Sequence, residues 1–226
     1  MNITITHGPG NSAAEVLLAS GEICTAEGGS MIAMSGDMSI ETSTHTRSGG
    51  GGVLKAAKRM LSGESFFLNH FTAGGKGGEV WLATALPGDM MQYELDKDNL
   101  IVQGGSYVAS EKGVNIDLGW QGFKSLLSGE GMFWIHLTGI GKILLNSFGA
   151  IYPVEVDGEY IVDTGHIVAF QETLDFKVTK AGKSWMSSFL GGEGLVCRFH
   201  GRGTVWCQSH NPSSFGHMLG PMLKTR

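Results

Sequence analysis

Runs in which apolar and polar residues alternate recur along the chain, and each is followed by a glycine-containing turn and a second apolar run. The alternating runs cover residues 66–72, 132–138 and 196–200, and the second runs cover 80–83, 143–145 and 205–207. Alternation with a period of two places successive side chains on opposite faces of a strand. Each pair of runs, joined by its glycine turn, therefore predicts a β-hairpin.

Two short phrases accompany these runs three times in the same order. A Gly-Gly-Ser-like phrase occupies residues 28–33, 104–109 and 164–169, and a Leu-Ser-Gly-Glu-like phrase occupies 61–64, 127–130 and 190–193. Self-similarity of this kind is typical of repeat architectures. We expect internal repeats at about 19–95, 96–156 and 157–210, followed by an apolar C-terminal tail at 211–226.

One such unit exposes sheet edges and an apolar face, so it should not be stable alone. Packing three units together buries the shared face and pairs the edges. The sequence therefore predicts a single all-β domain over residues 1–226, with three tandem repeats closed into a pseudo-threefold barrel or prism. The 36 glycines are expected to mark its turns and bulges.

The segments that cross from one half of each repeat to the other are apolar and carry basic residues. Residues 53–61 and 123–127 have the spacing of one helical face, and 185–190 is similar in composition. Such segments suit a membrane surface or a partner groove, although they could instead fold back over the end of the barrel. The contact residues predicted on this basis are Leu54, Lys55, Lys58, Arg59, Phe123, Lys124, Trp185 and Met186.

Three polar residues recur at corresponding places in the repeats: His70, His136 and Arg198. Alternation puts His136 on the same face as Trp134, and this more polar face is expected to be the outer one. The three residues could form an anion site or a subunit contact. The alternative is that they are ordinary polar positions on a solvated or subunit-facing surface.

Composition excludes several classes of function. The net charge of −5 opposes a general affinity for nucleic acid, which depends on clustered Lys and Arg. The histidines have no His-x-His spacing and the three cysteines no C-x-x-C spacing, so no metal site or cofactor is expected. The start of the chain lacks a signal-like segment and no apolar run is long enough to cross a bilayer, so we expect a cytoplasmic protein with reduced, buried cysteines.

The repeated phrases, together with the closing Gly-Thr-Val-Trp-Cys-Gln at 203–208, resemble the altered-inheritance-of-mitochondria-24 family over residues 3–221. The resemblance implies a β fold like that of the tryptophan-RNA-binding attenuation protein, a short relative of the double-stranded β-helix. Eukaryotic relatives are associated with the mitochondrial inner membrane, and the bacterial members have no settled activity. No binding residue for tryptophan or RNA is carried over to this chain.

The pattern favours a non-enzymatic, homo-oligomeric β scaffold or binding protein that contacts a membrane surface or a protein partner. An alternative is an enzyme or small-ligand carrier with a pocket between repeats, near Trp134, His136 and His166. A weaker alternative is RNA binding by a ring of subunits, which the acidic charge opposes.

Overall fold

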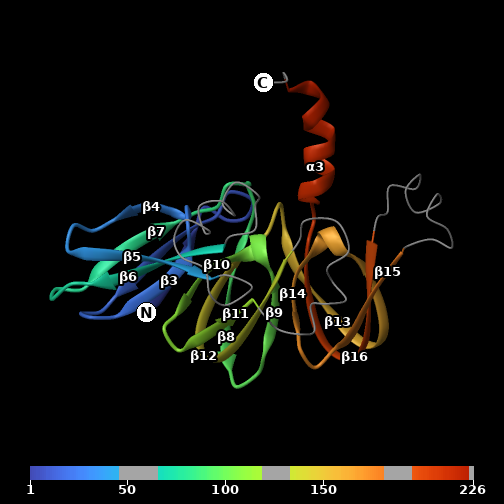
Figure 1. Ribbon diagram of the computed structural model, residues 1–226, viewed down its shortest axis with the longest axis horizontal. Coiled ribbons are helices and arrows are strands. Elements are labelled where there is room, and N and C mark those ends of the chain that lie inside the picture. The colour runs from blue at the N-terminus through green and yellow to red at the C-terminus, as the bar shows by residue number, and fades with distance from the viewer. Residues whose placement is uncertain (46–65, 119–132, 181–194, 224–226) are drawn as a thin grey trace.

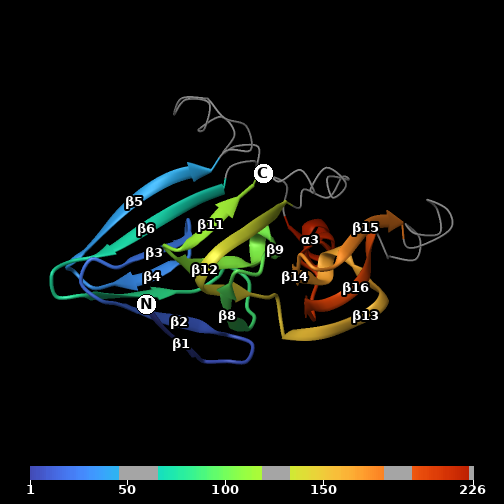
Figure 2. The same cartoon turned by 90° about the horizontal axis from the view of Figure 1, so that it is seen from below.

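The computed structural model describes residues 1–45, 66–118, 133–180 and 195–223. Most of these residues lie in β-strands, which confirms the all-β prediction. Figures 1 and 2 show the strands arranged along the long axis of the molecule, with the blue N-terminal strands at one end and the orange and red C-terminal strands at the other. Among the described residues one α-helix is present, α3 (Pro212–Leu219), and it projects from the body of strands.

The described residues contain sixteen strands, β1 to β16. They are β1 (Asn2–Thr6), β2 (Ala13–Leu18), β3 (Ile23–Glu27), β4 (Met31–Met34), β5 (Met38–His45), β6 (Phe66–Ala73), β7 (Gly78–Leu82), β8 (Met90–Asp96), β9 (Leu100–Gln103), β10 (Tyr107–Glu111), β11 (Val114–Asp117), β12 (Trp134–Asn146), β13 (Ile151–Asp163), β14 (Ile167–Gln171), β15 (Asp175–Lys180) and β16 (Leu195–Gln208). The 3-10 turns η1 (Gly104–Ser106) and η3 (Thr164–His166) join β9 to β10 and β13 to β14. A third, η4 (Gly220–Met222), follows α3.

These strands form two sheets of unequal size. The smaller has the order β1-β2-β7-β4, and the larger follows the path β13-β16-β14-β9-β12-β10-β3-β6-β5. Three further strands lie off this path, where β8 and β11 pair with β12 and β15 pairs with β16. Neighbouring strands are antiparallel throughout, which allows short connections between elements that are close in sequence.

The three predicted hairpins are wrong. In the first part of the chain β6 and β7 are separated by residues 74–77, meet only at the isolated bridge between Gly74 and Gly77, and pair in different sheets. β12 and β16 run without a break through the glycine segments that were expected to reverse them. Gly139, Gly141 and Gly201 have φ values of +105°, +148° and +120°, which side-chain-bearing residues rarely adopt. These glycines therefore bend one long strand, so that β12 pairs with β9 and β11 along its first part and with β10 and β8 along its second.

The barrel or prism expected from the sequence is not closed within the described residues. The larger sheet begins at β13, and the smaller sheet ends at β4. The last part of β13 pairs with β16 alone among the described strands, and β4 with β7 alone. The two free edges lie toward opposite ends of the molecule in both views (Figures 1 and 2), so one chain cannot bring them together.

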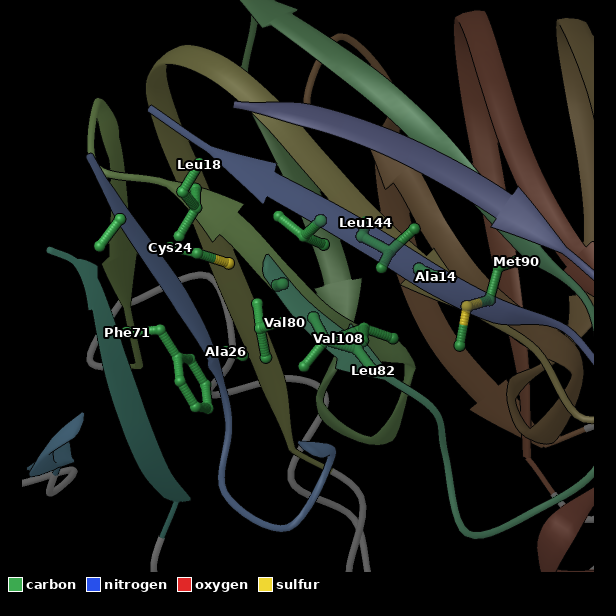
Figure 3. Close-up of a cluster of buried hydrophobic side chains, with 13 residues drawn as sticks. Ala14, Leu18, Cys24, Ala26, Phe71, Val80, Leu82, Met90, Val108 and Leu144 are labelled. Carbon is green, nitrogen blue, oxygen red and sulfur yellow. The ribbon is translucent and has the colours of Figure 1, made fainter. Parts of the chain in front are cut away.

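The core lies between the strands as three clusters of buried apolar side chains. Figure 3 shows the first, where Ala14 of β2, Cys24 of β3, Phe71 of β6, Val80 of β7 and their neighbours point toward one another. Burying a side chain such as Phe71 or Val80 stabilises the fold by roughly 1.5–3 kcal/mol. The first cluster therefore holds the small sheet against the larger one.

Candidate functional site

His70 lies in the middle of β6, opposite Thr25 of β3 on one side and Glu41 of β5 on the other. Its Nδ1 atom is 3.0 Å from Thr25 Oγ1, and its Nε2 atom is 2.8 Å from Ser43 Oγ. Both ring nitrogens thus have a hydroxyl partner on an adjacent strand. The ring is held by hydrogen bonds within its own sheet.

His136 occupies the matching place in β12, opposite Ile101 of β9 and Asp117 of β11. Its Nε2 atom lies 3.2 Å from Oε2 of Glu172, and the same oxygen accepts a hydrogen bond of 2.6 Å from Asn99 Nδ2. The side chain of His136 is 11% exposed. The prediction of an outward, solvated face is therefore wrong for His136, whose ring is buried and lies against Glu172 of the turn after β14.

Arg198 has the same position in β16, opposite Ile161 of β13 and Lys177 of β15. One of its terminal nitrogens donates a hydrogen bond of 2.7 Å to Oε1 of Glu159. Unlike His136, this side chain is 43% exposed. A surface hollow of about 210 Å³ lies beside it, lined by Glu159, Asp175, Phe176, Lys177, Arg198, Phe199 and His200.

The three polar residues make separate local contacts, each with partners on the strands around it. The residues proposed for a pocket are also separate, since His166 Nδ1 lies 2.8 Å from the Gln208 carbonyl oxygen and the Trp134 ring packs edge-on against Phe170. In the described parts of the chain, no group of three or more His, Cys, Asp or Glu side chains could hold a metal ion. In the described residues these polar side chains therefore occupy separate, locally hydrogen-bonded positions.

The cysteines behave as apolar core residues. Cys24, Cys197 and Cys207 are buried and free, as expected from the sequence. Burial raises the pKa of Cys24 and Cys197 to about 12 and that of Cys207 to about 11. At neutral pH these thiols stay protonated and unreactive.

One carboxyl group stands out for its electrostatics. Glu27, at the end of β3, is half-buried, and desolvation raises its pKa to about 7. Burial disfavours the charged form of a carboxyl group because water no longer solvates it. The charge on Glu27 therefore depends on pH near neutrality.

Exposed apolar side chains form a feature that sequence reasoning missed. All of β4 is exposed, with Met31, Ile32 and Met34 at 40%, 57% and 37%. At the other free edge Tyr160 and Ile161 of β13 are each 45% exposed. Ile32-Ala33 of β4 recurs as Val108-Ala109 in β10 and Val168-Ala169 in β14, where both residues are 0% exposed.

The C-terminal tail forms the projecting helix α3. Asn211 caps its first turn by accepting hydrogen bonds from the backbone N–H groups of Ser213 and Ser214. Phe215 packs edge-on against Phe148, with 5.4 Å between the ring centroids. The side chains further along are largely exposed, with Met218 at 59% and Met222 at 75%.

The family model described as mitochondrial biogenesis AIM24 matches residues 3–210. The chain belongs to this family. An uncharacterized protein from Streptococcus pyogenes serotype M6 is 30% identical over 202 residues, covering 87% of this chain and 81% of the relative. A crystal structure of another Streptococcus pyogenes protein has a TM-score of 0.80 at 28% identity, covering 98% of this chain and 99% of that one.

The AIM24 match confirms the resemblance read from the Gly-Gly-Ser-like and Gly-Thr-Val-Trp-Cys-Gln phrases. In the part of the chain that the structure describes, no helix is long and apolar enough to cross a membrane. The crossover residues predicted to make contacts lie outside the described residues. They are Leu54, Lys55, Lys58, Arg59, Phe123, Lys124, Trp185 and Met186.

Proposed function

We propose that this AIM24 family member is a non-enzymatic, homo-oligomeric β scaffold that presents its crossover segments and its tail to a binding partner. The observation that carries the proposal is the contrast between two kinds of surface. The polar positions are paired locally in separate places, whereas apolar side chains at sheet edges and on α3 lack cover from the described part of the chain. Contiguous exposed apolar surface on a folded protein marks interaction sites.

The scaffold consists of three tandem repeats in a single domain, and the strand pairing supports this. β4, β10 and β14 each pair with β7, β12 or β16 through a ladder whose register shifts after the first residue pair. β3, β9 and the end of β13 each pair with the strand that carries His70, His136 or Arg198. The pairing favours placing β8 in the second repeat and the first part of β13 in the third, slightly earlier than the boundaries read from the sequence.

The binding surface proposed here includes the basic, apolar crossovers, and a membrane surface is the occupant that their composition fits best. Lys and Arg beside apolar side chains attract anionic lipids while the apolar groups enter the headgroup region. Sedimentation with vesicles that contain anionic lipid tests this, with a variant in which Lys55, Lys58, Arg59 and Lys124 are replaced by Gln. The wild type should pellet and the variant should remain in the supernatant, and a wild type that stays in the supernatant contradicts membrane contact.

Two further elements of the proposal have other tests. Light scattering should give a mass that is a multiple of the 24.0 kDa chain, because the exposed edges favour association between copies. A cytoplasmic location fits the three free, buried cysteines, since reducing compartments keep thiols unpaired. A wild-type protein that remains a monomer at micromolar concentration contradicts the homo-oligomeric scaffold.

A small-ligand carrier is the second candidate, and one observation favours it. The hollow beside Arg198 brings Lys177 and His200 together with Glu159 and Asp175, so charges of both signs surround about 210 Å³. A zwitterionic or weakly anionic small molecule would suit such a lining. Calorimetric titration with inorganic phosphate, comparing wild type with Arg198→Ala, tests whether anions bind there.

A further inference from the structure

Two junctions between strands of neighbouring repeats share one register. β10 pairs with β3, and β14 pairs with β9, in both cases antiparallel. Ala109 lies opposite Ala26, Ser110 opposite Thr25 and Glu111 opposite Cys24. Ala169 lies opposite Val102, Phe170 opposite Ile101 and Gln171 opposite Leu100. Counted from the Gly-Gly-Ser-like phrase of each repeat, these are the same positions.

The central residues of the strands at both junctions are buried. Val108 and Ala109 of β10 are 0% exposed, and so are Val168, Ala169 and Phe170 of β14. On the other side of the junctions Leu100, Ile101 and Val102 of β9 are also 0% exposed, and Thr25 of β3 is 8% exposed. Each junction therefore buries the apolar side chains of both strands.

β4 corresponds to β10 and β14 but lacks such a junction among the described strands. It pairs with β7 on one side, with the same register shift as its counterparts, and its other edge is free. Ile32 is 57% exposed where Val108 and Val168 are 0% exposed. A free, apolar strand edge exposes unpaired backbone N–H and C=O groups that can pair with another strand.

The end of β13 corresponds to β3 and β9 and is the complementary half of a junction. It pairs with β16 on one side, and its other edge has no described partner. Tyr160 and Ile161 are each 45% exposed, whereas Leu100 and Ile101 at the same positions of β9 are 0% exposed. The first repeat thus has an unused β4, and the third repeat has an unused β13 end.

The other free edges in the molecule differ from these two. β5, β11 and β15 each pair with one described strand only, so that edge is treated alike in all three repeats. β1 and β8 also have one described partner each, β2 and β12, but neither is of the strand types that form the two junctions. Among the described strands, only β4 and the end of β13 lack a junction that their counterparts make. The two edges are also mutually complementary, because one supplies the strand type that the other needs.

Resting on the proposed repeat scaffold, we propose that two copies of this chain associate head to tail, with β4 of one copy adding to the end of β13 of the next. Transferring the shared register places Ala33 opposite Val162, Met34 opposite Ile161 and Ser35 opposite Tyr160. The two edges lie toward opposite ends of the molecule, so the partner strand comes from a second copy (Figures 1 and 2). Such a heterologous interface generates a ring if the rotation closes and an open chain of subunits if it does not.

The test uses two full-length variants that each block one edge, Met34→Lys and Ile161→Lys. A charge at either position faces an apolar strand at the junction, so each variant alone should have the 24.0 kDa mass of one chain by light scattering. A mixture of the two should give complexes of two chains and nothing larger, because each complex uses the intact β13 of one variant and the intact β4 of the other. The double variant Met34→Lys with Ile161→Glu should recover the wild-type mass, since opposite charges then face each other across the junction.

Ile140→Lys is the matched control, because Ile140 is 56% exposed but lies on β12 away from both edges. It should keep the wild-type mass. Circular dichroism and a thermal melt check that each variant is folded. If a lysine variant does not fold, the double variant Met34→Cys with Ile161→Cys replaces it, and oxidation should link chains into a ladder on a denaturing gel because the native cysteines are buried.

Several outcomes overturn this inference without touching the wider scaffold proposal. If the wild type is oligomeric and either lysine variant keeps its mass, the subunits associate through another surface. If Met34→Lys still forms dimers through β13, or Ile161→Lys through β4, the interface is symmetric rather than head to tail. A monomeric wild type instead contradicts both proposals, so the two failures are distinguishable.

Discussion

His136 Nε2 lies 3.2 Å from Glu172 Oε2, so a buried histidine of β12 is tied to the turn that follows β14. The same carboxylate oxygen accepts a hydrogen bond from Asn99, which precedes β9. Three segments of the chain are thereby held by one side chain. The contact links neighbouring parts of the sheet.

Removing that link should destabilise the protein. Glu172→Ala leaves a largely buried imidazole and the Asn99 amide without their shared acceptor, which is expected to cost about 1–2 kcal/mol in the free energy of unfolding. Urea denaturation measures this loss in the free energy of unfolding. The control is Asp157→Ala, which breaks an ion pair whose side chains are 75% and 82% exposed and should leave the midpoint unchanged. Equal effects of the two substitutions would mean that Glu172 contributes no more than a surface charge.

Glu27 should make stability fall as pH rises toward neutrality. Its pKa is raised from 4.5 to about 7 by burial, so the folded state binds this proton more tightly than the unfolded state. Relative to Glu27→Gln, the wild type should lose stability between about pH 4.5 and pH 7 and stay level above that range. Because the side chain is only half-buried, we expect a difference of about 2 kcal/mol at pH 8.

The measurement is a series of urea unfolding curves at several pH values for the wild type and Glu27→Gln. Exposed Glu41→Gln serves as the control, because it lacks a comparable burial. If the difference in the free energy of unfolding between wild type and Glu27→Gln stays constant from pH 4.5 to pH 8, Glu27 has the same pKa in the folded and unfolded states.

Adding even a methyl group at Gly88 is expected to destabilise the fold. A Cβ atom at this position would lie 1.7 Å from the Ser147 carbonyl oxygen, and backbone atoms cannot move aside without disturbing the adjacent pairing. Gly88→Ala should lower the free energy of unfolding by about 2–3 kcal/mol. Gly36→Ala is the matched control, since nothing lies within 4 Å of its Cβ position, and its thermal melt should resemble that of the wild type.

The three cysteine thiols should react slowly with thiol reagents in the folded protein. All three cysteines are buried and their raised pKa values keep them protonated at pH 8. Ellman's reagent should therefore react slowly with native protein and release three equivalents in guanidinium chloride. Rapid reaction of one equivalent with the native protein would place a cysteine at the surface.

The sequence predicted the all-β class and the family correctly because both depend on local patterns. Alternation in residues 66–72 gives β6, and the phrase at 104–109 gives the turn η1 followed by β10. The hairpins failed for a physical reason: a glycine at positive φ can either reverse a strand or bend it. At Gly139 and Gly201 the chain bends, and only the neighbouring strands decide between the two outcomes.

The functional positions were harder to place because burial depends on tertiary neighbours. His70, His136 and Arg198 do occupy matching places between flanking strands, yet their exposure differs with what packs over each. The exposed apolar edges could not be predicted from the sequence, because exposure depends on which strands lie beside them. β4 and β10 share a central apolar pair, Ile32-Ala33 and Val108-Ala109, so the missing neighbour separates an open edge from a buried one.

The break between β6 and β7 at residues 74–77 has a consequence for how the protein opens. β12 and β16 each bind strands at both of their ends, so a local opening at one end disturbs the other and the two halves unfold cooperatively. The sheet β1-β2-β7-β4 shares no strand with the larger sheet and has no such coupling. Its amide protons should exchange with deuterium first, and a neighbouring chain seated on β4 would slow that exchange at the least anchored part of the molecule.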